Sequence, residues 1–143
     1  MIQVNHPREI TPEFETVCRK LADAGVVLGN QAVLLKGVND KADLQKEMNE
    51  LLLKNRVWPY YLYQCDLSAG MHHFRTSIEK GLKIIDRLIG HTSGLAVPTY
   101  IVEAPGGGGK VPLHPSTLYR PVSGNKAILK NFEGEFFKYI EPE

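Results

Sequence analysis

The spacing of apolar residues along the chain predicts strands that alternate with helices. Amphipathic helices place apolar residues three or four positions apart, and this spacing occurs in three stretches. They are residues 12–24, 41–52 and 77–88. Short apolar runs, typical of buried strands, flank these stretches at residues 2–4, 26–35, 57–65 and 99–102. Strands joined by helices form right-handed crossovers, so we expect an α/β fold with a parallel sheet.

Capping residues support two of the predicted helix starts. Thr11 stands before Pro12 at the head of the first helix, and Asp40 stands before the second. A polar break at residues 29–31 interrupts the second predicted strand. Because a polar break inside a buried run often marks a functional site, these residues are candidates for one.

The character of the chain changes after residue 104. Three prolines interrupt regular structure, at Pro112, Pro115 and Pro121. Two β-like runs, residues 127–130 and 136–140, flank a turn at Glu133 and Gly134, which predicts a hairpin. We therefore expect residues 1–104 to form β/α units, and residues 105–143 to form a glycine-rich loop and a β-hairpin within one structural unit.

Composition and charge narrow the function classes. The chain has 143 residues and a formal net charge of +1, with both signs interspersed, so we expect one domain and neither a nucleic-acid nor a membrane partner. No apolar run has the length of a membrane span and no signal-peptide pattern is present, which predicts a cytoplasmic protein. Cys18 and Cys65 are too few for a disulfide framework or a zinc site, so we expect no bound metal.

Lys110 follows a run of four glycines, namely Gly106, Gly107, Gly108 and Gly109. Glycine loses the most backbone entropy on folding, so such a run indicates a need for bare backbone. A phosphate-binding P-loop does not fit, because Ala104 replaces its first glycine and Val111 its serine or threonine. Three interpretations remain: another anion site, an exposed loop, or backbone close to pyridoxal phosphate (PLP), to which Lys110 forms a Schiff base.

Two carboxylates follow predicted strands, at the edge where parallel sheets bind ligands. Asp66 ends the third strand and Glu103 the fourth, so both are expected to face one pocket. Such a pair is costly unless a cation lies between its members, which predicts a cationic ligand. The alternative for Asp66 is a cap of the loop before Ser68. Aromatic residues of the third strand belong either to the core or to a cofactor-stacking surface, namely Tyr60, Tyr61 and Tyr63.

Seven short motifs in the same order make the chain resemble the lysine 2,3-aminomutase family. They are Asn5-His6-Pro7, Leu28-Gly29-Asn30-Gln31, Leu35-Lys36-Gly37-Val38-Asn39-Asp40, residues 59–66, His73-Phe74-Arg75-Thr76, Gly90-His91-Thr92-Ser93-Gly94 and Pro105 to Lys110. That family consists of PLP-dependent aminomutases that use radical S-adenosylmethionine (SAM) chemistry. The resemblance covers nearly the whole chain. It implies the carboxyl-terminal portion of a partial parallel (β/α) radical-SAM barrel, followed by a small β-rich segment.

The resemblance also implies roles for single residues. Lys110 would hold PLP as a Schiff base beside the glycines, and Tyr63 would lie near PLP. Asp66 and Glu103 fall where the family binds the side-chain ammonium of substrate lysine. The family has aspartate at the second place, and the longer glutamate leaves open another cationic amino acid, such as arginine, as substrate. Gln31 matches a glutamine that contacts SAM.

The radical SAM signature is missing from this sequence, because Cys18 and Cys65 cannot supply the three cysteines that ligate a [4Fe-4S] cluster. Lys41 also stands where the family has a zinc-ligand cysteine. We therefore expect the carboxyl-terminal part of an L-lysine 2,3-aminomutase-type isomerase, inactive alone. An unpaired strand edge near Ile2 would join the missing barrel segment or a second copy. The alternative from another class is a non-catalytic module that binds PLP or mediates assembly.

Overall fold

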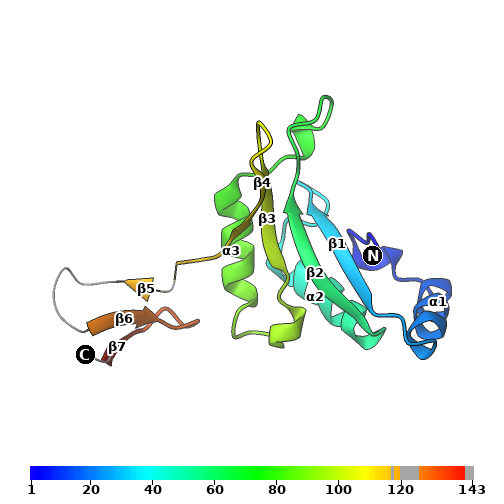
Figure 1. Cartoon of the computed structure of the whole chain (residues 1–143), viewed down its shortest axis with the longest axis horizontal. Helices are drawn as coiled ribbons and strands as arrows, with labels where there is room; N and C mark the ends of the chain where they lie inside the picture. Colours follow the sequence, from blue (N-terminus) through cyan, green and yellow to red (C-terminus); the bar gives the residue numbers. More distant parts are fainter. Residues whose placement is uncertain (117, 120–125, 141–143) are drawn as a thin grey trace.

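The computed structural model describes residues 1–116, 118–119 and 126–140, and shows a mixed α/β fold with two separate sheets (Figure 1). The larger sheet has the strand order β1-β2-β3-β4. Its strands are β1 (Leu28–Leu34), β2 (Val57–Gln64), β3 (Thr99–Ala104) and β4 (Gly109–Leu113). β1, β2 and β3 are parallel, which confirms the prediction, whereas β4 is antiparallel to β3.

Three α-helices occur in the described residues: α1 (Pro12–Asp23), α2 (Ala42–Lys54) and α3 (Ile78–Leu88). Short 3₁₀ turns lie at η1 (Pro7–Glu9), η2 (His72–Phe74) and η3 (Gly94–Ala96). Thr11 caps α1 as predicted, since its side chain accepts a hydrogen bond from the Phe14 amide. The prediction that Asp40 caps α2 is wrong. Lys41 is the N-cap residue, and Asp40 Oδ1 instead accepts from the Gly37 amide, because the preceding loop turns tightly.

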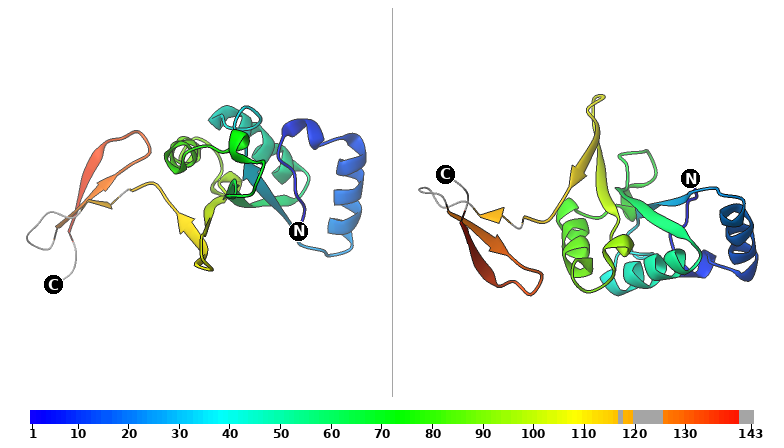
Figure 2. Two further views of the ribbon diagram at one scale, coloured as in Figure 1. Left: turned by 90° about the horizontal axis from the view of Figure 1, so that it is seen from above. Right: turned by 60° about the horizontal axis from the view of Figure 1, so that its bottom comes forward.

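The core lies between the larger sheet and the helices α2 and α3, which cover one of its faces (Figure 2). Alternate strand residues are buried on this side, namely Ala32, Leu34, Leu62, Gln64 and Tyr100. The helices contribute Met48, Leu52, Ile84, Ile85 and Leu88. Gly81 of α3 lies against the ring of Tyr100 so closely that a Cβ at this position would clash with it. The missing side chain of Gly81 therefore sets the distance between α3 and the sheet.

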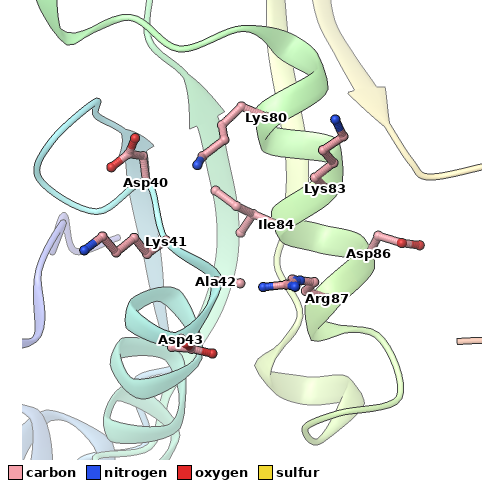
Figure 3. Close-up of a pocket in the computed structure, with 9 residues that line it drawn as sticks. All are labelled: Asp40, Lys41, Ala42, Asp43, Lys80, Lys83, Ile84, Asp86 and Arg87. Atoms are coloured by element: carbon pink, nitrogen blue, oxygen red, sulfur yellow. The ribbon is translucent and has the colours of Figure 1, made fainter. Parts of the chain in front are cut away.

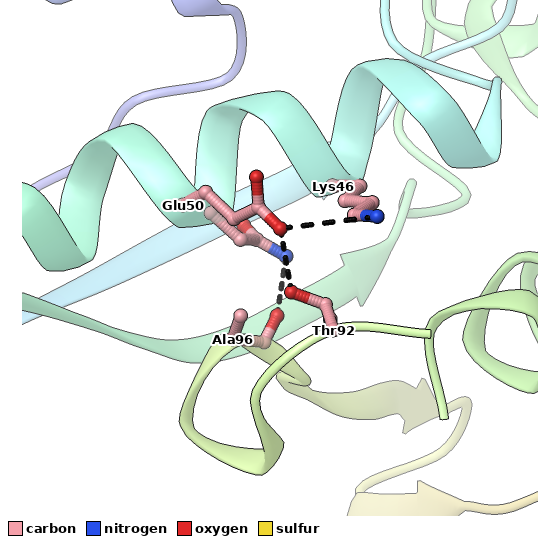
Figure 4. Close-up of polar contacts among 5 residues, drawn as sticks. Lys46, Glu50, Thr92 and Ala96 are labelled. Atoms are coloured by element: carbon pink, nitrogen blue, oxygen red, sulfur yellow. Dashed lines mark hydrogen bonds and ion pairs between the residues drawn. The ribbon is translucent and has the colours of Figure 1, made fainter. Parts of the chain in front are cut away.

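Polar groups tie α2 to the loop that precedes β3 (Figure 4). The buried side chain of Asn49 donates to the carbonyl oxygen of Ala96 at 2.9 Å. Thr92 Oγ1 donates to Glu50 Oε1 at 2.7 Å, and the same carboxylate oxygen lies 4.0 Å from Lys46 Nζ. These contacts fix the return of the chain from α3, and so help to place β3 beside β2.

The predicted strand at residues 2–4 is reduced to a single bridge at Ile2, and the side chain of Asn30 explains why. Ile2 makes an isolated parallel bridge with Asn30. Asn30 is 1% exposed; its Oδ1 accepts from the Val4 amide at 2.7 Å, and its Nδ2 donates to the Val4 carbonyl at 3.0 Å. Ile2 still pairs with β1 through two backbone hydrogen bonds, of 2.8 and 2.9 Å, whereas at Val4 the side-chain amide takes the place of such pairing. Because the hydrogen bonds to Val4 satisfy the buried amide of Asn30, the polar stretch at residues 29–31 lies within one continuous strand.

The smaller sheet lies at the opposite end of the molecule from α1 (Figure 1). It consists of β5 (Leu118–Tyr119), β6 (Lys126–Lys130) and β7 (Phe136–Ile140). The antiparallel pairing of β6 with β7 confirms the predicted hairpin. The turn of this hairpin contacts the rest of the chain through Phe132. The ring of Phe132 packs on Gly90, and its centroid lies 5.4 Å from that of the His91 ring. The boundary at residues 104 and 105 stays a prediction.

Candidate functional site

The face of the larger sheet opposite α2 and α3 carries most of the predicted site residues. Side chains alternate along a strand, so residues between the buried positions project from this open face. β1 contributes Gln31, which pairs in register with Tyr61 of β2. β2 also contributes Tyr63, which pairs with Ile101 of β3. The pattern thus brings Gln31 and Tyr63, predicted from separate parts of the sequence, to one surface.

Lys110 lies on the same surface, directly across the β3–β4 pair from Glu103. Its Nζ is 5.4 Å from the ring centroid of Tyr63 and 5.9 Å from that of Tyr61. A hydrogen bond with Tyr63 is the main cause that raises the pKa of Lys110, and the charge of Glu103 adds to it. Both Lys110 and Glu103 are exposed. The free chain therefore holds Lys110 as an ammonium group beside two aromatic rings.

The three tyrosines of β2 lie outside the core, half-buried at the surface. The Tyr60 hydroxyl donates to the Tyr61 hydroxyl at 2.8 Å, and this bond raises the pKa of Tyr60. The ring centroids of Tyr61 and Tyr63 are 5.5 Å apart with an edge-to-face arrangement. Their exposed parts are available to a ligand, which is one of the two uses that the sequence left open.

The glycine run forms the turn of the β3–β4 hairpin, which the sequence did not reveal. Gly106, Gly107 and Gly109 have φ angles of 70°, 82° and 74°, a region that other residues rarely adopt. The turn closes with a hydrogen bond of 3.2 Å from the Gly108 amide to the Ala104 carbonyl. A tight turn therefore explains these glycines without a ligand. It also brings Lys110 back beside β3, which a flexible loop would not do.

Asp66 and Glu103 line one cavity of about 280 Å³ at the carboxyl ends of β2 and β3. The sequence rule that places both carboxylates at this edge thus holds in the structure. Arg75 lines the same cavity, and sequence reasoning missed it. The signal that could have found Arg75 is the pair of carboxylates. Two neighbouring carboxylates need a cation, and a basic residue of the same chain can supply it.

The segment that carries Arg75 is held by the buried side chain of Gln64. Gln64 Nε2 donates to the Thr76 carbonyl at 2.7 Å, and Gln64 Oε1 accepts from Thr76 Oγ1 at 3.4 Å and from the Tyr100 hydroxyl. Burial raises the pKa of Tyr100 to about 12, so this hydroxyl stays protonated as a donor. Gln64 therefore joins the end of β2 to the wall of the cavity.

A second cavity, of about 510 Å³, lies between α2 and α3 and contains none of the predicted site residues (Figure 3). Its wall carries charges of both signs, from Asp40, Lys41, Asp43, Lys80, Lys83, Asp86 and Arg87. Lys83 pairs with Glu79 at 2.7 Å. Since both acidic and basic groups line this cavity, its charges do not point to a ligand of one sign.

The described residues contain no group of three or more side chains placed to hold a metal ion. Cys18 and Cys65 are buried, 1% and 3% exposed, and burial raises the pKa of both thiols. Among the described residues no helix has the length and apolar character that crossing a bilayer requires.

The comparisons with known proteins all find similarity to 2,3-aminomutases. Residues 85–143 match a family model described as Lysine-2,3-aminomutase. The chain is 55% identical over 139 residues to the L-lysine 2,3-aminomutase of Fusobacterium nucleatum, a match that covers 97% of the chain and 32% of that relative. It is 57% identical over 138 residues to the enzyme of the same name from Clostridium subterminale, covering 96% and 33%. A glutamate 2,3-aminomutase of Clostridioides difficile is 50% identical over 134 residues, covering 94% and 32%. The chain spans about a third of the length of these relatives.

Proposed function

Because the chain belongs to the lysine 2,3-aminomutase family, as a homologue of its carboxyl-terminal part, we propose that it forms part of an L-lysine 2,3-aminomutase-type isomerase. The proposed reaction moves the α-amino group of lysine to the β carbon by PLP-assisted radical chemistry. The observation that carries the proposal is the position of Lys110 on the open sheet face, beside the ring of Tyr63 and opposite Glu103.

We interpret the larger sheet as the last strands of a partial parallel (β/α) barrel of the radical-SAM type. In support, α2 and α3 cover one face of parallel strands, as helices cover a barrel wall, so the open face corresponds to the interior. Apolar side chains near the β1 edge are exposed, with Val17 at 54%, Val26 at 47% and Val27 at 90%. We propose that another barrel segment, or a second copy of the chain, covers this edge.

The groups around Lys110 fit PLP. Lys110 offers an exposed amine for a Schiff base, and the rings of Tyr61 and Tyr63 flank it. A Cβ built at Gly106, Gly107 or Gly109 would meet no atom within 4 Å, so space is open beside the turn. When bound, PLP supplies the carbonyl carbon that carries the migrating nitrogen. Tyr63 raises the pKa of Lys110, so it keeps this amine in the ammonium form while the site is empty.

We assign roles to the other predicted site residues from their positions in the fold. Asp66 and Glu103 bind the cationic end of the substrate in their shared cavity. Gln31, on the same open face, contacts SAM. The [4Fe-4S] cluster needs three cysteine ligands, and this chain has two cysteines, both buried in separate parts of the fold. We therefore propose that the chain alone is inactive.

Two alternatives remain. Glu103 reaches one methylene further than an aspartate, which leaves open arginine or another cationic amino acid as substrate. A side-chain carboxylate, as in the substrate that the name of the Clostridioides difficile relative gives, would be repelled by Asp66 and Glu103. The shortage of cysteines favours, for the chain alone, a module that binds PLP or mediates assembly without chemistry.

An amino-acid assay on the complete enzyme tests the proposal. With PLP, SAM and reductant, lysine should yield β-lysine, and Glu103→Asp should retain this activity. Asp66→Asn should lower kcat/KM for lysine by roughly 10- to 100-fold, the cost of about 1.5–3 kcal/mol for a lost charged contact. Turnover of arginine without lysine would show the alternative substrate. Turnover of neither, with PLP bound, would favour the non-catalytic module.

A further inference from the structure

We propose that Arg75 is a specificity-determining residue, the built-in counter-charge of the Asp66/Glu103 cavity, and that it limits this cavity to side chains with one positive charge. The inference rests on the proposed function in one respect, since it takes the cavity to receive the side chain of an amino acid. It goes beyond that function because it assigns a role to a residue outside the carboxylate pair.

The composition of the cavity wall is the first support. Of the described residues that line it, three carry a charge: Asp66, Glu103 and Arg75. The uncharged part of the wall contains apolar groups from Leu67, Ile78, Val102 and Pro105, beside Gln64, Cys65, Thr76 and Ser77. Such a wall accommodates methylene groups that lead to one charged end. Two carboxylates and one guanidinium leave a net charge of one negative unit, which a single ammonium group neutralises.

The chain fixes Arg75 in this position from both sides. The carbonyl of the preceding residue, Phe74, accepts from the Lys36 amide at 2.8 Å, just beyond the end of β1. The following residue, Thr76, is bonded to Gln64 at the end of β2. The Arg75 amide itself donates to the His72 carbonyl at 3.2 Å. The backbone that carries Arg75 is therefore attached to the sheet edge at the residues on both sides of it.

The charge of Arg75 is not cancelled by a close partner at its buried nitrogen. Arg75 Nε is buried and has no hydrogen-bond partner within the described residues. The field of Arg75 reaches the cavity wall, since it opposes the effect of Asp66 on the pKa of Cys65, which burial raises. The positive charge of Arg75 therefore opposes the binding of a second positive charge in this cavity.

Ligand binding to the chain itself tests this inference without turnover. The probes are n-butylammonium, with one charge, and 1,4-butanediammonium, with two, titrated while amide NMR shifts of Leu67 and Ala104 are followed. In the unmodified chain the second charge should add little affinity. In Arg75→Gln the monocation should bind roughly three- to ten-fold more tightly, and the dication should gain by a larger factor.

Two controls separate charge from structure. Lys80→Gln removes a cation that lies near Arg75 but outside this cavity, and should leave both affinities unchanged. Arg75→Lys keeps the charge and should behave as the unmodified chain. Weaker binding of both probes by Arg75→Gln, an unchanged ratio of their affinities, or no response at Leu67 and Ala104 would overturn the inference. Failure of lysine turnover with the expected probe affinities would count against the proposed function alone.

Discussion

The protonation of Lys110 is the residue-scale property on which the proposed chemistry depends. Its hydrogen bond with Tyr63 and the charge of Glu103 raise the pKa of the amine, which favours the ammonium form. A Schiff base requires the neutral amine. The free site therefore favours the ammonium form, and the contacts that PLP makes beside Lys110 would have to outweigh this preference for Lys110 to react before the other lysines.

Replacement of Tyr63 should make Lys110 more reactive. In Tyr63→Phe the main cause of the raised pKa is lost, so the neutral amine appears at lower pH and an aldehyde reacts faster at fixed pH. Tyr61→Phe is the matched control, because Tyr61 has a smaller effect on the pKa of Lys110 than Tyr63 and should shift the profile less. The measurement is the pH dependence of imine formation at Lys110, read by trapping and mass spectrometry. A profile unaffected by Tyr63→Phe would contradict the assignment of that hydrogen bond.

Sequence reasoning succeeded at single residues where a positional rule applies. Asp66 and Glu103 share a cavity because the carboxyl ends of neighbouring parallel strands meet. Arg75 could not be found this way, because its position depends on the loop after β2 folding back onto Gln64, a contact between distant residues. Asp40 failed as a cap because the loop geometry, and not the residue type, decides which side chain reaches the helix end.

Elements with a clear apolar period were predicted well, and elements defined by pairing were not. α1, α3 and β2 lie close to their predicted bounds. β4 was not predicted, because its apolar content is low and its pairing with β3 depends on the turn at the glycines. That hairpin places Lys110 opposite Glu103. The strand that was not predicted, β4, is therefore the one that brings these two residues together.

The contact between α3 and β3 predicts the effect of an added methyl group. Gly81→Ala should raise helix propensity by about 1 kcal/mol, yet overpack against Tyr100 at a cost of about 1–3 kcal/mol. We expect a net loss of about 1 kcal/mol in the free energy of unfolding, measured with urea. In a Tyr100→Leu background the same change should be neutral or stabilising, which isolates the contact. An equal effect in both backgrounds would contradict it.

At the scale of the whole molecule, the small sheet contacts the α/β part through the side chain of Phe132. Figure 2 shows β5, β6 and β7 away from the larger sheet. Phe132 packs on Gly90 and His91, whereas the exposed side chains of Phe136 and Phe137, at 62% and 50%, belong to the same hairpin. The arrangement allows this sheet to open without unfolding the core.

Loss of the Phe132 contact should therefore loosen the small sheet alone. In Phe132→Ala, amide hydrogen exchange at residues 128–131 should accelerate about five-fold, in line with roughly 1 kcal/mol for a partly buried phenyl ring. Exchange in β1 and β2 should stay unchanged. Phe137→Ala, also in the hairpin, serves as the control and should have a smaller effect. Faster exchange throughout the chain would show that the two sheets form one cooperative unit.

The central claim is that this chain carries the PLP-binding lysine of an aminomutase. The most direct measurement is incubation of the chain with PLP, reduction with borohydride, and mapping of the modified peptides by mass spectrometry. Our account predicts a dominant adduct on Lys110, lost in Lys110→Ala and retained in Lys80→Ala. Absence of an adduct, or labelling spread evenly over the surface lysines, would contradict it.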